Sequence, residues 1–300
     1  MKTKTYLFAL MTMALTLGSC SDNENGIGGE TSKYITVSTS IGNMTRVATD
    51  AKGGQTFEEG DEISVYAWIG APTVAPETCE RVVNNAINKL TNGSWISTPQ
   101  MLWKNNCDKH YFIGVYPISA ISDLSAGEYT FDANKQTESD LLVAVNPDGL
   151  SYSADAQQIV PLTFTHVMAK LAVNLTYKNQ WGGIPTVEKV VVGNAAKEAT
   201  INYLTKVVTP STTAKEDFSL PEITENTKYV SVIIPQEEVT QLTIVIGGKN
   251  FVYDNGTPFK LESGKITTVN LEVGRDEIKL GDVKITNWED GSTFSGEALN

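Results

Sequence analysis

The sequence predicts an all-β protein, and three observations support that class. Apolar and polar residues alternate with a period of two over many short stretches. Most of these stretches end at glycine, proline, asparagine or aspartate, which are the residues that turns require. No long amphipathic helix is indicated, because "ERVVNNAINKL" (80–90) and "AAKEAT" (195–200) are at best short helices. This combination is typical of antiparallel β-sandwiches.

The N-terminus has the pattern of a bacterial export signal. Lys2 and Lys4 precede an apolar run over 6–17, which is too short to span a bilayer as a stable anchor. The run ends at "LGSC", and Cys20 lies where a lipoprotein signal, which this segment resembles, places the cysteine that receives diacylglycerol. We therefore predict a signal peptide over 1–19 and lipidated Cys20 as the first residue of the mature chain. The alternative is a plain secretory signal with an incidental cysteine.

A polar segment follows the cysteine. The sequence "SDNENGIGGE" is acidic and rich in glycine, so we predict a flexible tether over 20–33. Its early acidic residues resemble the surface-export signal of lipoproteins in the Bacteroidota. Because more than one acyl chain on one residue attaches a protein durably to a membrane, the expected location is the outer surface of the cell outer membrane.

The remaining chain is longer than one typical hydrophobic core, so we predict two domains. The first β-sandwich is expected over 34–170 and the second over 171–300. The apolar stretch over 162–177 crosses this boundary so continuously that the two domains would share it and meet tightly.

The first predicted strand, 34–41, places alternate residues on one face, namely Ile35, Val37, Thr39 and Ile41. The next strand, 62–68, does the same with Ile63, Val65 and Ala67. Further strands are predicted at 110–117, 140–147, 162–177, 187–194, 229–235, 241–248, 249–254, 265–273 and 283–288.

Charge and residue counts exclude some functions. The formal net charge is −12, and a surface of this sign repels phosphate backbones, so we expect no nucleic-acid partner. Two histidines and three cysteines make a dedicated transition-metal site hard to build, and we expect no cofactor. Outside the cytoplasm Cys79 and Cys107 could form a disulfide, which depends on whether their Cα atoms approach closely enough.

Seven stretches, taken in order, resemble one known family. They are "FEEGDEISVYAW" (57–68), "YFIGVYP" (111–117), "DLLVAVNP" (140–147), "PLTFTHVMAKLAVNL" (161–175), "VSVIIPQE" (230–237), "FKLESGKITTVNLEV" (259–273) and "ITNWEDG" (285–291). The chain is similar to the fimbrillin-like proteins of the Bacteroidales, the subunits of type V pili and their relatives. The resemblance implies two transthyretin-like β-sandwich domains in tandem, export as a lipoprotein and polymerisation outside the cell.

In pilus-forming members of that family an arginine-specific protease cuts after the first strand, and a strand of another subunit replaces the one removed. Carried over to this chain, the cut falls at Arg46, and the exchanged strand carries Ile35, Val37 and Ile41. Cys20 leaves with the removed fragment, so the subunit passes from its lipid anchor in the outer membrane to a fimbrium. The alternative for Arg46 is an ordinary solvated loop arginine.

The C-terminal end differs from that of a shaft subunit. After Trp288 the apolar residues are only Phe294, Ala298 and Leu299, which do not form a good alternating donor strand. The preceding stretch over 277–288 alternates better, although it also fits the last two strands of the second domain. We therefore expect an accessory, tip or anchoring subunit rather than a shaft subunit.

A second hypothesis is a surface lipoprotein that binds a glycan or a host ligand without polymerising. Of the five tryptophans, those in "GSWISTPQMLWKNN" (93–106) are the best candidates for an exposed aromatic patch. An enzyme is the third and weakest hypothesis, because no catalytic motif is present. We interpret His166 as a hydrogen-bonded packing residue, His110 as lacking a catalytic partner, and 132–140 as a polar loop, since Thr137 stands where a calcium loop needs glycine.

Overall fold

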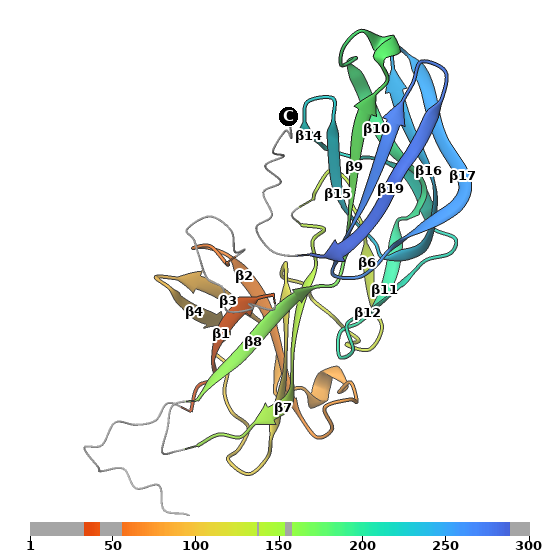
Figure 1. Ribbon diagram of the computed structural model, residues 1–300. Coiled ribbons are helices and arrows are strands. Elements are labelled where there is room, and N and C mark those ends of the chain that lie inside the picture. Colours follow the sequence, from red (N-terminus) through yellow and green to blue (C-terminus); the bar gives the residue numbers. More distant parts are fainter. Residues whose placement is uncertain (1–32, 43–55, 137, 154–157, 289–300) are drawn as a thin grey trace, which may run out of the picture. The chain divides into compact units, whose positions relative to one another are not determined.

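The computed structural model describes residues 33–42, 56–136, 138–153 and 158–288 (Figure 1). Almost all regular structure in these ranges is β-strand, and the only helices there are two short 3-10 turns, η1 (Thr78–Glu80) and η2 (Asn179–Trp181). The predicted all-β class is confirmed.

The first sheet has seven strands in the order β1-β8-β7-β5-β2-β3-β4. Their bounds are Thr36–Ile41 (β1), Glu62–Ile69 (β2), Val83–Thr91 (β3), Ser94–Thr98 (β4), His110–Tyr116 (β5), Leu142–Leu150 (β7) and Ile159–His166 (β8). Neighbouring strands are antiparallel except β1 and β8, which run parallel. The first strand of the chain therefore lies beside the last strand of this sheet.

The remaining strands form three further sheets. A five-stranded sheet has the order β14-β15-β9-β18-β19, a four-stranded sheet the order β13-β10-β16-β17, and a three-stranded sheet the order β12-β11-β6. Their bounds are Gly127–Thr130 (β6), Ala169–Tyr177 (β9), Val187–Ala196 (β10), Glu198–Asn202 (β11), Val207–Pro210 (β12), Lys215–Ser219 (β13), Glu222–Thr224 (β14), Lys228–Ile233 (β15), Gln236–Ile246 (β16), Lys249–Leu261 (β17), Lys265–Val273 (β18) and Ile278–Asn287 (β19). Strand β6 comes from the first half of the chain and pairs with β11.

The continuous apolar stretch over 162–177 serves two sheets. Strand β8 belongs to the seven-stranded sheet, and β9 pairs with β15 and β18 in the five-stranded sheet. Val167 and Met168, between the two strands, are fully buried. The chain thus passes from one sheet to the next without a solvent-exposed linker, while the boundary at residue 170 stays a prediction.

The buried apolar residues form two clusters on opposite faces of the seven-stranded sheet. Ile63, Val65 and Ala67 of β2 lie in the smaller cluster, as their alternation predicted. Tyr66 and Trp68, on the other face, lie in the larger cluster together with residues of the other three sheets. The central strand β2 is therefore buried on both faces, which period-two alternation alone does not indicate.

Both segments considered as short helices are strands. Residues 80–90 contain most of β3, and residues 195–200 contain the end of β10 and the start of β11. In β3, Asn85 has a left-handed backbone with φ of 55°, and the pairing with β2 shifts register between Val65 and Ala67. A bulge of this kind interrupts the alternation of side chains, so the strand pattern is lost in the sequence.

Arg81 fastens the loop after β5 to the seven-stranded sheet. Its guanidinium is buried and donates to Asn84 Oδ1 at 2.9 Å, to the Ile121 carbonyl at 2.7 Å and to the Ser122 carbonyl at 2.5 Å. It also lies 5.4 Å from the ring centroid of Tyr66. This loop leads into β6, so Arg81 helps to place the strand that joins the three-stranded sheet.

We predict that Arg81→Ala lowers the free energy of unfolding by about 2–4 kcal/mol, because it leaves buried carbonyl groups without donors. Urea denaturation followed by tryptophan fluorescence measures the change. The exposed Arg275 provides the matched control, and Arg275→Ala should cost less than about 1 kcal/mol. Equal losses in the two variants would contradict the role given to Arg81.

Candidate functional site

The first strand, β1, occupies a groove in the seven-stranded sheet. On one side β1 pairs with β8 from Thr36 opposite Ile159 to Ile41 opposite Phe164 (Figure 1). The hydrogen bond from Gly42 N to the Phe164 carbonyl, at 2.8 Å, continues the ladder past the end of β1.

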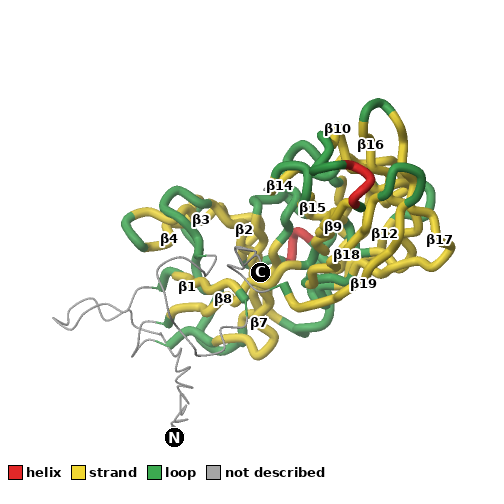
Figure 2. The backbone as a smooth tube through the Cα atoms, turned by 45° about the horizontal axis from the view of Figure 1, so that its top comes forward, coloured by secondary structure: helices red, strands yellow, loops and turns green. Residues whose placement is uncertain are grey.

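The other side of β1 is bordered by β4 and the segment 101–103. Ile35 N donates to the Met101 carbonyl at 2.9 Å, and Trp103 N donates to the Lys33 carbonyl at 3.2 Å. Farther along, Trp95 Nε1 donates to Thr39 Oγ1 at 3.0 Å. We call the space that β1 fills, between β8 and these residues, the β1 groove; Figure 2 shows β1 and β8 side by side in the backbone trace.

The inward side chains of β1 complete the smaller core cluster. Ile35 and Val37 are only 2% and 7% exposed, and Ile41 is half-buried against the same cluster. Ser38 and Ser40, between them, are exposed. The predicted alternation of strand 34–41 is thus present, and the strand covers apolar surface that would otherwise meet water.

Half of β8 depends on β1 for its backbone pairing. Strand β7 pairs with β8 only from Phe164 to His166, whereas β1 pairs with it from Ile159 to Phe164. Within the described residues no other strand pairs with the first half of β8. Without β1 this half would have neither a ladder nor a covered apolar face.

Aromatic rings form the floor and one wall of the groove. The ring of Phe57 lies among three other rings. Its centroid is 5.3 Å from that of Trp95, 5.1 Å from that of Phe164 and 5.4 Å from that of Tyr116. All three contacts are edge-to-face, the arrangement that aromatic quadrupoles favour. The wall that carries Trp95 is therefore held by Phe57 as well as by the hydrogen bond from Trp95 to Thr39 of β1.

His110 holds the segment beside β1 in place. Its Nε2 accepts the Lys104 backbone N–H at 3.0 Å, and its ring meets Trp103 edge-on with 5.0 Å between centroids. The imidazole is buried, and this burial lowers the pKa of His110 below its usual 6.5, against the opposing effect of Asp108. A neutral ring is required, because a protonated Nε2 could not accept from Lys104.

We predict that the folded protein loses stability as the pH falls below about 6.5, since the unfolded chain then binds a proton that folded His110 resists. The stability is complete above that pH and declines below it. Urea denaturation at pH 7.5 and 5.5 should show a smaller decline in His110→Gln than in the unsubstituted protein. His166 is present in both proteins, so an identical decline would contradict the prediction.

We predict that Ile35→Ala lowers the free energy of unfolding by about 2–4 kcal/mol, because it leaves a cavity under β1. The exposed Ser38→Ala, on the same strand, should change it by less than about 0.5 kcal/mol. Hydrogen exchange adds a local measurement: in Ile35→Ala the amides of the first half of β8 should exchange faster than those of β5. Uniform acceleration over both strands would show that β1 does not support β8 specifically.

The other predicted site residues are placed as follows. Cys20 and Arg46 lie outside the described residues, so lipidation and cleavage stay predictions. Cys79, on η1, and Cys107, in the loop before β5, are exposed free thiols. The disulfide considered from the sequence is therefore not formed in the structure, and the Cys107 thiol instead lies 3.3 Å from Asn106 Oδ1.

The predicted aromatic patch over 93–106 is wrong. Trp103 is only 9% exposed and Trp95 is half-buried, and both contact the smaller core cluster. The two indoles border β1, and a sequence pattern does not show which strand will cover a ring. The alternating "SWIST" of β4 is the signal that could have placed Trp95 on an inward face.

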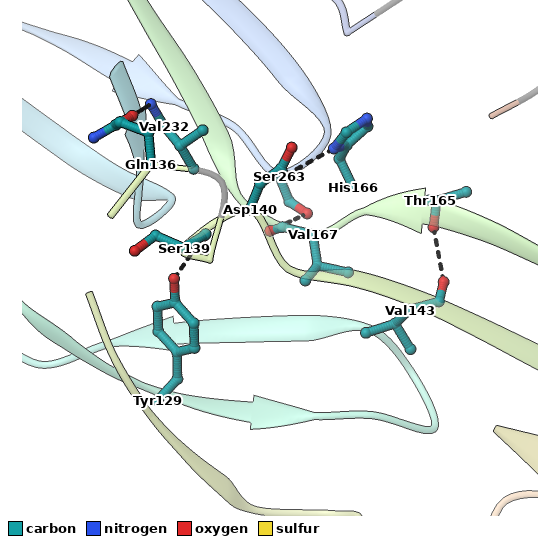
Figure 3. A network of polar contacts seen from close by, with 10 residues as sticks. All are labelled: Tyr129, Gln136, Ser139, Asp140, Val143, Thr165, His166, Val167, Val232 and Ser263. Carbon is teal, nitrogen blue, oxygen red and sulfur yellow. Dashed lines mark hydrogen bonds and ion pairs between the residues drawn. The ribbon is translucent and has the colours of Figure 1, made fainter. Parts of the chain in front are cut away.

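His166 is a packing residue, as expected. Its Nδ1 lies 2.8 Å from Asp140 Oδ1 (Figure 3). Its ring stacks on Trp288 with 3.9 Å between centroids. The polar loop over 132–140 is also structural, because Gln136 Oε1 accepts the Val232 N–H of β15 at 2.7 Å and Tyr129 donates to the Ser139 carbonyl at 2.7 Å. In the described part of the chain no three His, Cys, Asp or Glu side chains gather as metal ligands would.

Comparison with models of protein families shows which family the chain belongs to. The model of a family described as fimbrillin-like matches residues 45–288. The chain belongs to the fimbrillin-like family. The matched range of this fimbrillin-like protein includes both walls of the groove and begins after β1.

Solved structures with the same fold come from species of Bacteroides and Parabacteroides. A candidate cell adhesion protein from Bacteroides uniformis is 17% identical, with a TM-score of 0.64 over 86% of this chain and 100% of that one. A candidate cell adhesion protein from Bacteroides ovatus is also 17% identical, with a TM-score of 0.65 over 85% and 98%. One from Parabacteroides distasonis is 11% identical, with a TM-score of 0.51 over 86% and 97%. No curated protein matches the fimbrillin-like chain. Among its described helices none is both long and apolar enough to cross a membrane.

Proposed function

We propose that this fimbrillin-like protein is an accessory, tip or anchoring subunit of a cell-surface fimbria. In this proposal it is exported as a lipoprotein acylated at Cys20, displayed at the outer membrane, and built from two transthyretin-like sandwiches in tandem that divide near residue 170. Assembly proceeds by strand exchange after an arginine-specific protease cuts at Arg46. Its partners are then other fimbrial subunits, and its role is structural and adhesive rather than catalytic.

The single observation that carries the proposal is the position of β1. One short strand covers the smaller core cluster and supplies the backbone partner for the first half of β8. Burial of each large apolar side chain contributes about 1.5–3 kcal/mol, so losing Ile35, Val37 and Ile41 exposes a surface that strongly favours refilling. A strand from another molecule can restore both the ladder and the burial.

The positions of the three arginines favour a single cut. Arg81 is buried and held by three hydrogen bonds, so a protease cannot reach it in the folded protein. Arg275 is exposed but lies in the short connection between β18 and β19, where Gly274 N donates to the Glu277 carbonyl at 2.8 Å. Arg46 lies in the longer connection between Gly42 and Thr56, whose sequence is rich in small and polar residues. Connections of this composition are preferred sites of nicking.

We predict that an arginine-specific protease cuts the lipid-free folded protein first at Arg46, as read from fragment masses over a time course. Arg81 should be cut only after unfolding, and Arg46→Gln should remove the first cut without changing thermal stability. A first cut at Arg275, or at Arg81 in the folded state, would contradict the proposal.

The cut protein should then take up a strand from another subunit and form a complex that survives gel filtration. Cut protein that stays monomeric with every fimbrial subunit offered would instead favour the second hypothesis, a surface lipoprotein that binds a glycan or a host ligand. A glycan array on the folded protein tests that hypothesis directly.

A further inference from the structure

We infer that the β1 groove selects the replacing strand by two side chains besides the apolar ones, and that this strand belongs to a different protein. It needs a hydrogen-bond acceptor such as a hydroxyl where Thr39 now lies, and it binds more tightly with an aliphatic residue where Thr36 now lies. The inference rests on the proposed strand exchange and adds to it the chemistry of the partner.

The first requirement comes from Trp95. Its indole N–H can only donate, and in the structure it donates to Thr39 Oγ1 at 3.0 Å. The contact of its ring with Phe57 fixes where this N–H points. A strand with an aliphatic residue in place of Thr39 would cover the half-buried N–H and give it no acceptor, which costs binding free energy.

The second requirement comes from Thr36. Its Oγ1 is buried and has no hydrogen-bond partner among the residues that the structure describes, and Thr36 pairs with Ile159 of β8. A buried hydroxyl without a partner is unfavourable, whereas valine has the same shape and no polar atom. The native strand is therefore not the best occupant of its own groove, and a strand with valine there would displace it with a gain.

Direction and register follow from β8. The replacing strand must run parallel to β8, and a shift by one residue would turn its apolar side chains away from the core. Ser38, which pairs with Pro161, is exposed, so its position selects no particular side chain. The preferred pattern therefore has apolar residues at the positions of Ile35, Val37 and Ile41. It has an aliphatic residue at position 36 and a hydroxyl at position 39.

The alternating stretch over 278–289 does not have that pattern. The window 278–284 begins with Ile278 and Leu280 but places Lys279 at the position of Thr36 and Lys284 at that of Ile41. The window 283–289 begins with Val283 and Ile285, yet it again places a lysine at the position of Thr36 and puts a glutamate at that of Ile41. An ammonium group beside the buried Thr36 Oγ1 position is costly, so the stretch 278–289 of a second copy of this chain is a poor donor.

Peptide exchange tests the inference. Protein nicked at Arg46 is incubated with fluorescent peptides of sequence 33–42, either unsubstituted or carrying Thr36→Val, Thr39→Val or Ser38→Ala, and uptake is measured by anisotropy. We expect the Thr36→Val peptide to bind about 3- to 10-fold more tightly and the Thr39→Val peptide about 5- to 10-fold more weakly. Ser38→Ala is the matched control, because Ser38 is exposed opposite Pro161, and should bind within about twofold of the unsubstituted peptide.

A protein with Trp95→Phe separates the role of the hydroxyl from general strand propensity. In that protein the unsubstituted and Thr39→Val peptides should bind alike, because no N–H remains to be satisfied. Persistence of the full difference would overturn the role given to Trp95.

Three further outcomes of the peptide experiment would each overturn part of the proposal. Equal uptake of all four peptides would overturn the inference and leave strand exchange standing. Uptake of none would overturn strand exchange, and the inference with it. Tight uptake of a peptide of sequence 278–288 would show that a second copy of this chain can be the donor and would overturn the assignment to a different protein.

Discussion

The structure depends on the pairing of β1 with β8. Strand β8 needs a partner along its first half, and the core beneath it needs a cover, and one six-residue strand supplies both. The pairing is parallel and joins residues more than a hundred positions apart, so β1 is held by contacts distant in the sequence. In the proposed exchange, a strand from another chain would take over both roles of β1.

Residues outside β1 help to hold the walls of the β1 groove in place. Its wall at 101–104 is held by His110, and its wall at Trp95 is held by Phe57 and the rings around it. The central strands β2, β5 and β7 contribute to the larger core cluster on the opposite face, which joins them to strands of the other sheets. Because β1 contacts only the smaller cluster, its loss removes the cover from one core and leaves the other intact.

The apolar positions of β1 are suited to the core, but its polar positions are not optimal. Thr39 satisfies an indole N–H, while the hydroxyl of Thr36 is buried and finds no partner within the described part of the chain. In the proposed exchange, a strand with a better-matched side chain at the position of Thr36 would displace β1, and this would give the exchange a direction. The family match begins at residue 45 and therefore covers the groove without this strand.

The sequence by itself determined the all-β class, the position of the first strand, the inward side of Ile35 and Val37, and the family. These follow from local alternation and from motifs whose residues are neighbours in the chain. It did not reveal β3, because the bulge at Asn85 breaks the alternation, and it misplaced the tryptophans over 93–106. Only the tertiary structure decided that β1 pairs with β8 and that Trp95 donates to Thr39. The physical reason is that pairing across a hundred residues, and the burial of a ring beneath a distant strand, depend on which surfaces the whole chain brings together and leave no periodic signal in any one segment.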